Sequence, residues 1–137
     1  MNSKNQYLLM FTGKEWYNHL SSAEIQEVIE RSRAWFERLA ASGKIKGSHA
    51  LARDGATITG ASGRVVSDGP FAESKEAVGG FLVLEAGSLE EVIAIARENP
   101  AVAHGTTIEI RPLTDECPLD VRARTLASEA QLTEAIA

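Results

Sequence analysis

Apolar and polar positions change their spacing along the chain, and each spacing predicts a different element. Residues 7–11 and 80–85 contain compact apolar runs, which are typical of strands buried on both faces. Residues 44–52 also have a strand-like composition, and residues 106–111 alternate threonine and isoleucine with charged residues. The pattern therefore predicts four strands of one sheet.

Two segments carry the polar signature that starts a helix. Residues 21–24 and 88–91 each have the spacing of a capping box, in which a hydroxyl and a carboxylate satisfy free backbone N–H groups. The first predicted helix ends at Gly43 and the second at residues 99–100, and we expect Trp35 and its neighbour Phe36 to pack. The first apolar stripe comprises Ile25, Val28, Ile29, Ser32, Phe36, Leu39 and Ala40, and the second comprises Leu89, Val92, Ile93 and Ala96.

Glycine-containing turns at residues 53–55 and 60–63 predict a small hairpin with arms at 57–59 and 64–67. The order strand, helix, strand, hairpin, strand, helix, strand matches the ferredoxin-like split βαβ arrangement, an α+β fold. In that arrangement both helices cover one face of an antiparallel sheet. The other face is left bare, so we expect two copies of the chain to pair through it as a homodimer.

The length of 137 residues suits a single domain, with a core over about residues 7–113 and an extension over residues 118–137. Apolar residues recur through the extension, so we expect it to form a short helix that either embraces the partner copy or caps the core. The lone Cys117 has no second cysteine and no suitably spaced histidine, and we interpret it as an ordinary thiol.

Composition and charge limit the locations and partners that we expect for the chain. The sequence is 44% hydrophobic and 24% charged, and no apolar run approaches the ~20 residues needed to cross a bilayer. The polar N-terminus precedes an apolar stretch that is too short for a signal peptide, so a cytoplasmic location is expected. The net charge of -5 and the scattered cations argue against nucleic-acid binding. We expect neither a nucleic acid nor a membrane as partner.

Two motifs stand close together after the predicted hairpin. The turn Asp68-Gly69-Pro70-Phe71 is followed by the charged run Glu73-Ser74-Lys75-Glu76 and by Gly79-Gly80-Phe81. With the closing segment Glu109-Ile110-Arg111-Pro112-Leu113, these motifs resemble the DGPF branch of the YCII-related family over most of the predicted core. The resemblance implies a ferredoxin-like fold paired into a dimeric α+β barrel. It also suggests an accessory role beside alternative sigma factors.

Relatives of the YCII type carry a His–Asp pair around the first helix. An imidazole oriented by a carboxylate suits proton transfer near neutral pH. In this chain the corresponding positions fall near Ser32 and Ala41, which cannot do that chemistry. Activity of the dehydrochlorinase or isomerase kind would therefore need a different pair of residues.

The charged loop supplies most of the candidate site residues. Asp68 is either a turn former or a carboxylate at the mouth of a cleft, and Phe71 can anchor the loop in the core. Glu73, Lys75 and Glu76 lie just before the central strand, where sheet clefts are lined. We expect Lys75 to pair with an anionic ligand or a nearby carboxylate, and Glu73 or Glu76 to act as base or acceptor.

Histidine and tryptophan extend this set. His49 on the second strand is the preferred general base over His19 and His104, although each also suits a packing or surface role. Trp16, in the loop after the first strand, is positioned to wall a pocket. No histidine pair has a metal-ligand spacing and no nucleotide, nucleophile-elbow or Cys-x-x-Cys motif occurs, so no metal or cofactor is predicted.

Two functions fit these observations. The first is a small-molecule site in a cleft of the homodimer near the DGPF loop, with or without acid/base catalysis. Its candidate catalytic residues are Asp68, His49 and Glu73, and its candidate ligand-binding residues are Lys75, Glu76, Phe71 and Trp16. The second is a non-catalytic regulatory or protein-interaction module. The residues do not decide whether the chain is an enzyme.

Overall fold

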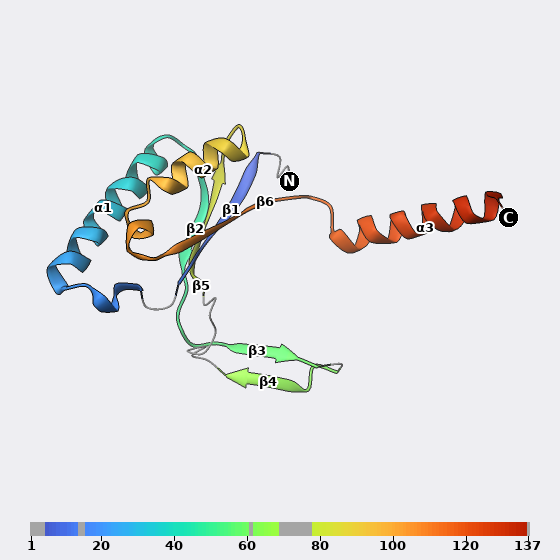
Figure 1. Ribbon diagram of the computed structural model, residues 1–137, viewed down its shortest axis with the longest axis horizontal. Helices are drawn as coiled ribbons and strands as arrows, with labels where there is room; N and C mark the ends of the chain where they lie inside the picture. Colours follow the sequence, from blue (N-terminus) through green and yellow to red (C-terminus); the bar gives the residue numbers. More distant parts are fainter. Residues whose placement is uncertain (1–4, 14–15, 61, 69–77, 137) are drawn as a thin grey trace.

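A computed structural model describes residues 5–13, 16–60, 62–68 and 78–136 of the chain, without the side chains of residues 65–68 and 136 (Figure 1). The strands are β1 (Gln6–Thr12), β2 (Ile45–Ala50), β3 (Ala56–Thr59), β4 (Val65–Asp68), β5 (Val78–Glu85) and β6 (Thr107–Pro112). The helices are α1 (Ser22–Ala41), α2 (Leu89–Arg97) and α3 (Pro118–Ile136), with two 3₁₀ helices, η1 (Trp16–His19) and η2 (Pro100–His104). The bounds lie close to those that the residue pattern predicts.

Four strands form one sheet in the order β2-β5-β1-β6, and every neighbouring pair is antiparallel. Leu9 in the centre of β1 pairs with Leu82 of β5 on one side and with Ile110 of β6 on the other. This order, with α1 and α2 as the crossover helices, confirms the predicted split βαβ fold. The predicted hairpin β3–β4 forms a separate two-stranded sheet.

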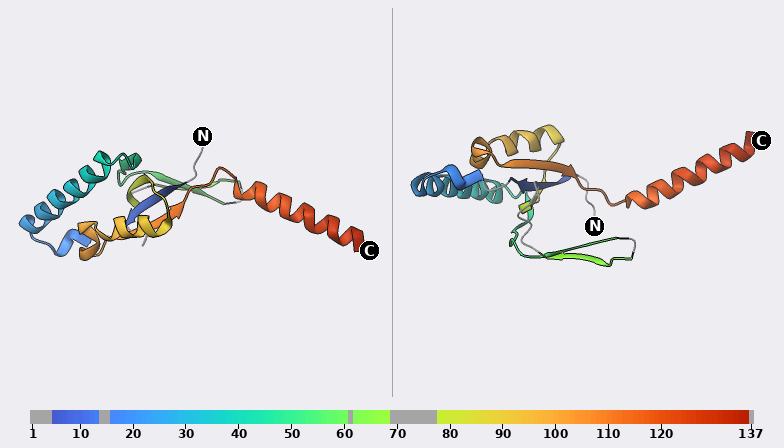
Figure 2. Two further views of the ribbon diagram at one scale, coloured as in Figure 1. Left: turned by 90° about the horizontal axis from the view of Figure 1, so that it is seen from above. Right: turned by 60° about the horizontal axis from the view of Figure 1, so that its bottom comes forward.

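Both crossover helices lie on one face of the sheet (Figures 1 and 2). Side chains alternate between the faces of a strand, so Leu9, Leu82 and Leu84 all point towards the helices and are at most 1% exposed. The helices complete the buried core with Trp35, Leu39, Val92 and Ala96. Burial of these side chains is the main contribution to the stability of the fold.

The other face of the sheet has no helix over it. In the register of β1 and β5, Leu8 lies beside Val83 and Met10 lies beside Phe81. All four side chains remain partly exposed in the single chain. We call this surface the bare face. Its apolar centre matches the surface through which self-association is predicted.

Helix α1 begins as its sequence predicts. The Ser21 hydroxyl accepts from the backbone N–H of Glu24 at 3.1 Å, and the Glu24 carboxylate accepts from the backbone N–H of Ser21 at 3.0 Å. Both halves of the capping box are therefore present, and they satisfy two N–H groups that have no partner inside the helix.

The buried side of α1 differs from the predicted stripe. Trp35 is 4% exposed, whereas Phe36 and Ile29 are 38% and 42% exposed, so the prediction that Phe36 and Ile29 pack inward is wrong. The Trp35 indole Nε1 donates to the backbone carbonyl of Ile95 in α2 at 3.0 Å, and its ring meets Phe11 edge-on with 6.4 Å between centroids. These two contacts set the rotation of α1 about its axis.

Helix α2 begins with a modified cap. The Ser88 hydroxyl accepts from the Glu91 N–H at 3.2 Å as predicted, but the Glu91 carboxylate accepts from Gly87 at 2.8 Å and not from Ser88. Leu89, which was expected to point inward, is 39% exposed. The helix ends at Arg97, close to the predicted stop, and Asn99 caps the following η2.

Helix α3 and the β3–β4 hairpin project from the body of the domain (Figures 1 and 2). α3 has 19 residues, which makes it longer than the short helix predicted for the extension. It points away from the core and therefore does not cap it, and the other alternative, that the extension embraces a partner copy, stays a prediction. Within the described ranges, no helix combines the length and the apolar character needed to cross a membrane.

The rotation of α1 yields a stability prediction. We expect Trp35→Ala to lower the free energy of unfolding by about 3–5 kcal/mol, because a buried aromatic side chain is removed from the core. Phe36→Ala, one residue further on the same helix, should cost about 1 kcal/mol or less because its ring is partly exposed. Urea unfolding followed by circular dichroism measures both values, and equal losses would contradict the observed helix orientation.

Candidate functional site

The two ends of the sheet carry different residues. β1 and β2 finish where β5 and β6 begin, and Thr12 pairs there with Val78 and with Thr107. We call this the loop end of the sheet. In the sequence, the 68–71 turn and its charged run stand between β4 and the start of β5. Of the candidate residues that the structure describes, His49 and Trp16 lie near this end.

His49 lies on the bare face near the loop end. It is opposite Phe81 in the register of β2 and β5, and the two rings are 5.8 Å apart between centroids. Next to it, Gly80 is buried, and a Cβ on this glycine would lie 3.0 Å from the His49 carbonyl oxygen. The second glycine of the 79–81 motif therefore lets β2 approach β5 closely.

Trp16 lies in η1 on the helix side of the loop end. Its ring stacks on the His104 imidazole with 6.3 Å between centroids and 22° between planes, and Tyr17 meets it edge-on at 5.7 Å. Gly105 follows His104 with a φ of 115°, and a Cβ there would lie 3.3 Å from Trp16 Cβ. A glycine is thus required for η1 to approach the turn into β6.

Glu24 supplies a negative charge to the same corner. The backbone N–H of Ser21, followed by its hydroxyl, lowers the pKa of Glu24 below the ordinary value of 4.5, and the charges of His104 and His19 act in the same direction. The carboxylate is therefore ionised at neutral pH. We call Trp16, His104 and Glu24 the η1 corner.

The structure places only part of the predicted site. Asp68 is the last residue of β4, paired in register with Ala56, and its side chain is not described. Phe71, Glu73, Lys75 and Glu76 lie outside the described residues.

The two remaining candidates, His49 and Trp16, share the loop end of the sheet but lie on opposite sides of it. His49 contacts Phe81 on the bare face, whereas Trp16 stacks with His104, in the η2 segment that contacts α1. The influence of the His104 charge on the pKa of Glu24 was missed by sequence reasoning, because Glu24 is recognisable there only as a capping residue.

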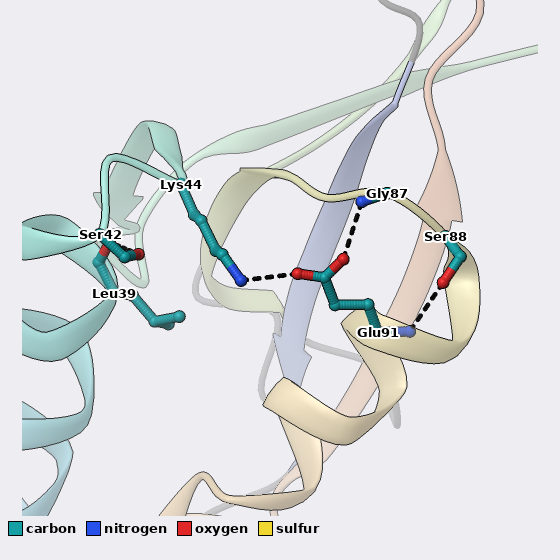
Figure 3. A network of polar contacts seen from close by, with 6 residues as sticks. All are labelled: Leu39, Ser42, Lys44, Gly87, Ser88 and Glu91. Atoms are coloured by element: carbon teal, nitrogen blue, oxygen red, sulfur yellow. Dashed lines mark hydrogen bonds and ion pairs between the residues drawn. The ribbon is translucent and has the colours of Figure 1, made fainter.

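The opposite end of the sheet holds a compact ionic contact (Figure 3). Lys44 Nζ lies 2.6 Å from Glu91 Oε1, while the second carboxylate oxygen accepts from the Gly87 N–H at 2.8 Å. Ser42 and Asn5 complete the rim of an open hollow around this pair. The cation and the carboxylate satisfy each other, and this network joins the end of α1 to the start of α2.

Metal binding has no support in the described part of the chain. No group of three or more histidine, cysteine, aspartate or glutamate side chains comes together there in a way that could hold an ion. Cys117 is exposed and unbonded, just before α3.

The split βαβ sheet with two helices on one face defines an α+β protein of the ferredoxin-like class. Within that class, the model of the YCII-related domain matches residues 6–116, and the chain belongs to this family. An uncharacterized protein of Rhizobium meliloti strain 1021 is 40% identical over 63 residues, which is 42% of this chain. The match spans about half of that relative, 48% of its length.

A solved structure also resembles the chain. It is the 5-chloro-2-hydroxyhydroquinone dehydrochlorinase of Burkholderia phenoliruptrix AC1100, in complex with 2,5-dihydroxybenzoquinone. The identity is 19% and the TM-score 0.47, over 81% of this chain and 95% of the dehydrochlorinase.

The Lys44–Glu91 contact predicts a pH-dependent stability. The hydrogen bond from Lys44, followed by that from Gly87, lowers the pKa of Glu91 below 4.5. A lowered carboxyl pKa stabilises the fold above the unfolded-state pKa, and this contribution is lost as the pH falls through the folded-state value. Glu91→Gln should therefore reduce stability at pH 7 and approach wild type near pH 3.

Denaturant unfolding at the two pH values measures this effect. Glu90→Gln is the matched control, since Glu90 is the exposed neighbour in the first turn of the same helix. A deficit of the Glu91 variant that is the same at both pH values would show that charge is not its cause.

Proposed function

We propose that the chain binds a small anionic molecule at the loop end of its sheet and that a histidine there exchanges a proton with it. The η1 corner carries this proposal. A Trp16 ring stacked on the His104 imidazole provides a flat apolar wall and a polar edge in one place. An imidazole is the side chain suited to proton exchange near neutral pH, and the ionised Glu24 carboxylate feels its charge.

The remaining candidate residues are consistent with this location. The charged run from Glu73 to Glu76 directly precedes β5 in the sequence, and Lys75 is the cation that we expect to pair with the anion. His49 approaches the same end from the bare face. Asp68, at the end of β4, and Phe71 would hold the loop. Proton transfer by His104 or His49 takes the place of the His–Asp pair that this chain lacks.

The second candidate function, a protein-interaction module, draws support from the projecting hairpin. All four residues of β3 are exposed, and Ile58 is 68% exposed. In the described residues this hairpin is a two-stranded sheet of its own, and a partner chain can add to the outer edge of such a sheet. The two functions differ in their ligand, so a single binding experiment distinguishes them.

Ligand binding is tested by thermal unfolding with benzoate, salicylate, succinate and inorganic phosphate as probes. A ligand present at 100 times its dissociation constant should stabilise the wild type by about 2.7 kcal/mol. Trp16→Ala and His104→Gln should abolish the shift, because they remove the ring wall and the titratable edge. Phe36→Ala, which removes an aromatic ring elsewhere on the surface, should retain it.

Two outcomes would count against the small-molecule proposal. One is a shift that persists in both corner variants. The other is a wild type that responds to none of the probes but recovers a defined protein in affinity capture, which favours the interaction module.

We also propose that the chain forms a homodimer through the bare face. Leu8, Met10, Phe81 and Val83 form an apolar centre there that a second copy would bury. Phe81→Glu should convert the dimer to a monomer at micromolar concentration in light scattering. Ala94→Glu, on the exposed side of α2, should leave the mass unchanged. A monomeric wild type would refute the pairing.

A further inference from the structure

Helix α3 has little support from its own chain. All of its described side chains are exposed, including Leu119 at 78% and Leu126 at 48%. Its side-chain bonds are local: Arg124 meets Glu116 at 2.8 Å, and the Thr125 hydroxyl donates to the Val121 carbonyl at 2.9 Å. In proteins, most of the stability of a helix comes from the packing of one of its faces. A helix of this kind gains stability when another surface covers its apolar side.

One side of α3 has the spacing of a coiled coil. The positions that share this side follow each other at alternating steps of four and three residues, and we call them the α3 seam. The α3 seam consists of Leu119, Ala123, Leu126, Ala130 and Thr133. Over two heptads this spacing lines up the five side chains on one side of the helix, which is the arrangement through which two helices pack side by side. Val121 and Leu132 lie on the opposite side of the helix and do not belong to it.

We propose that α3 pairs in antiparallel orientation with α3 of a second copy of this chain. In that orientation Leu119 faces Ala130 of the second copy, and Ala123 faces Leu126 of the second copy. The two-fold symmetry repeats both layers. Each layer then combines one large and one small side chain, which lets the helices approach closely and interlock.

Charges beside the α3 seam favour this orientation. The antiparallel arrangement places Arg122 next to Glu129 of the second copy, and symmetry repeats the pair. A parallel arrangement would place Glu129 next to Glu134 of the other helix and would stack Ala123 on Ala123. Opposite charges at these flanking positions select the partner and its direction. The seam is thus complementary to itself when one copy is reversed.

The position of α3 leaves the seam accessible to a second copy. The helix follows β6 and points away from the sheet, α1 and α2 in every view (Figures 1 and 2). The pairing uses no residue of the bare face or the η1 corner. It is therefore separate from the proposed sheet-face dimer and from the proposed ligand site.

Charge reversal in the full-length protein tests the pairing. Arg122→Glu and Glu129→Arg each place like charges opposite one another, so each variant alone should speed backbone hydrogen exchange over residues 119–133 by about tenfold, which corresponds to about 1.4 kcal/mol. An equimolar mixture of the two variants restores opposite charges at both sites. It should regain the slow exchange of the wild type.

Matched substitutions separate the seam from the rest of α3. Leu126→Gln should speed exchange, whereas Leu132→Gln, on the opposite side, should not. Arg124→Glu reverses an equal charge at a position outside the seam and should not respond to mixing with Glu129→Arg. Equal exchange in all variants, or a mixture that exchanges as fast as its components, would overturn the proposal. Because exchange is followed within α3, the result does not depend on whether the bare face also dimerises.

Discussion

The covering of only one sheet face is the constraint on which the rest of this structure depends. Leu9, Leu82 and Leu84 point towards α1 and α2. Because side chains alternate along a strand, the residues before and after each of these leucines point to the other face of the sheet. A shift of one residue in β1 would expose Leu9 and bury Met10 in its place. The register that buries the core leucines therefore also determines which residues lie on the bare face.

The same strand register determines where chemistry can take place. Because β1 and β2 end where β5 and β6 begin, segments that are distant in sequence deliver Trp16, His104 and His49 to one end of the sheet. The other end is closed by Lys44 and Glu91, whose charges neutralise each other. The Lys44–Glu91 contact thus joins α1 to α2 at one end of the sheet. The aromatic and histidine side chains lie at the loop end.

Local rules predicted the elements well, because their signals lie within a few residues of one another. The capping box at Ser21 and Glu24 and the stop near Asn99 depend on neighbouring backbone groups only. The choice between Trp35 and Phe36 was not available from the same rules, since the two rings are adjacent and both are large and mainly apolar. That choice is made by the Ile95 carbonyl, which is brought to the indole by the tertiary fold.

The candidate site was predictable to a smaller extent for the same reason. Trp16 and His49 were recognisable as residue types, but the stacking of Trp16 on His104 joins η1 to the turn before β6. Glu24 was recognisable as a cap, and its charge reaches His104 only after α1 packs beside η2. The sequence shows which residue types a site can use, whereas the tertiary fold determines which of them lie close together.

Helix α3 shows how local pattern and tertiary support can be independent of each other. Its alanine-rich sequence favours a helix without any help from the core, and the four-and-three spacing of the α3 seam adds a preferred side. All side chains of α3 that the structure describes are exposed, so the proposed pairing would supply a cover that the described part of the chain does not. In that proposal, specificity resides in pairs such as Arg122 and Glu129, whose separation along the helix determines which orientation brings opposite charges together.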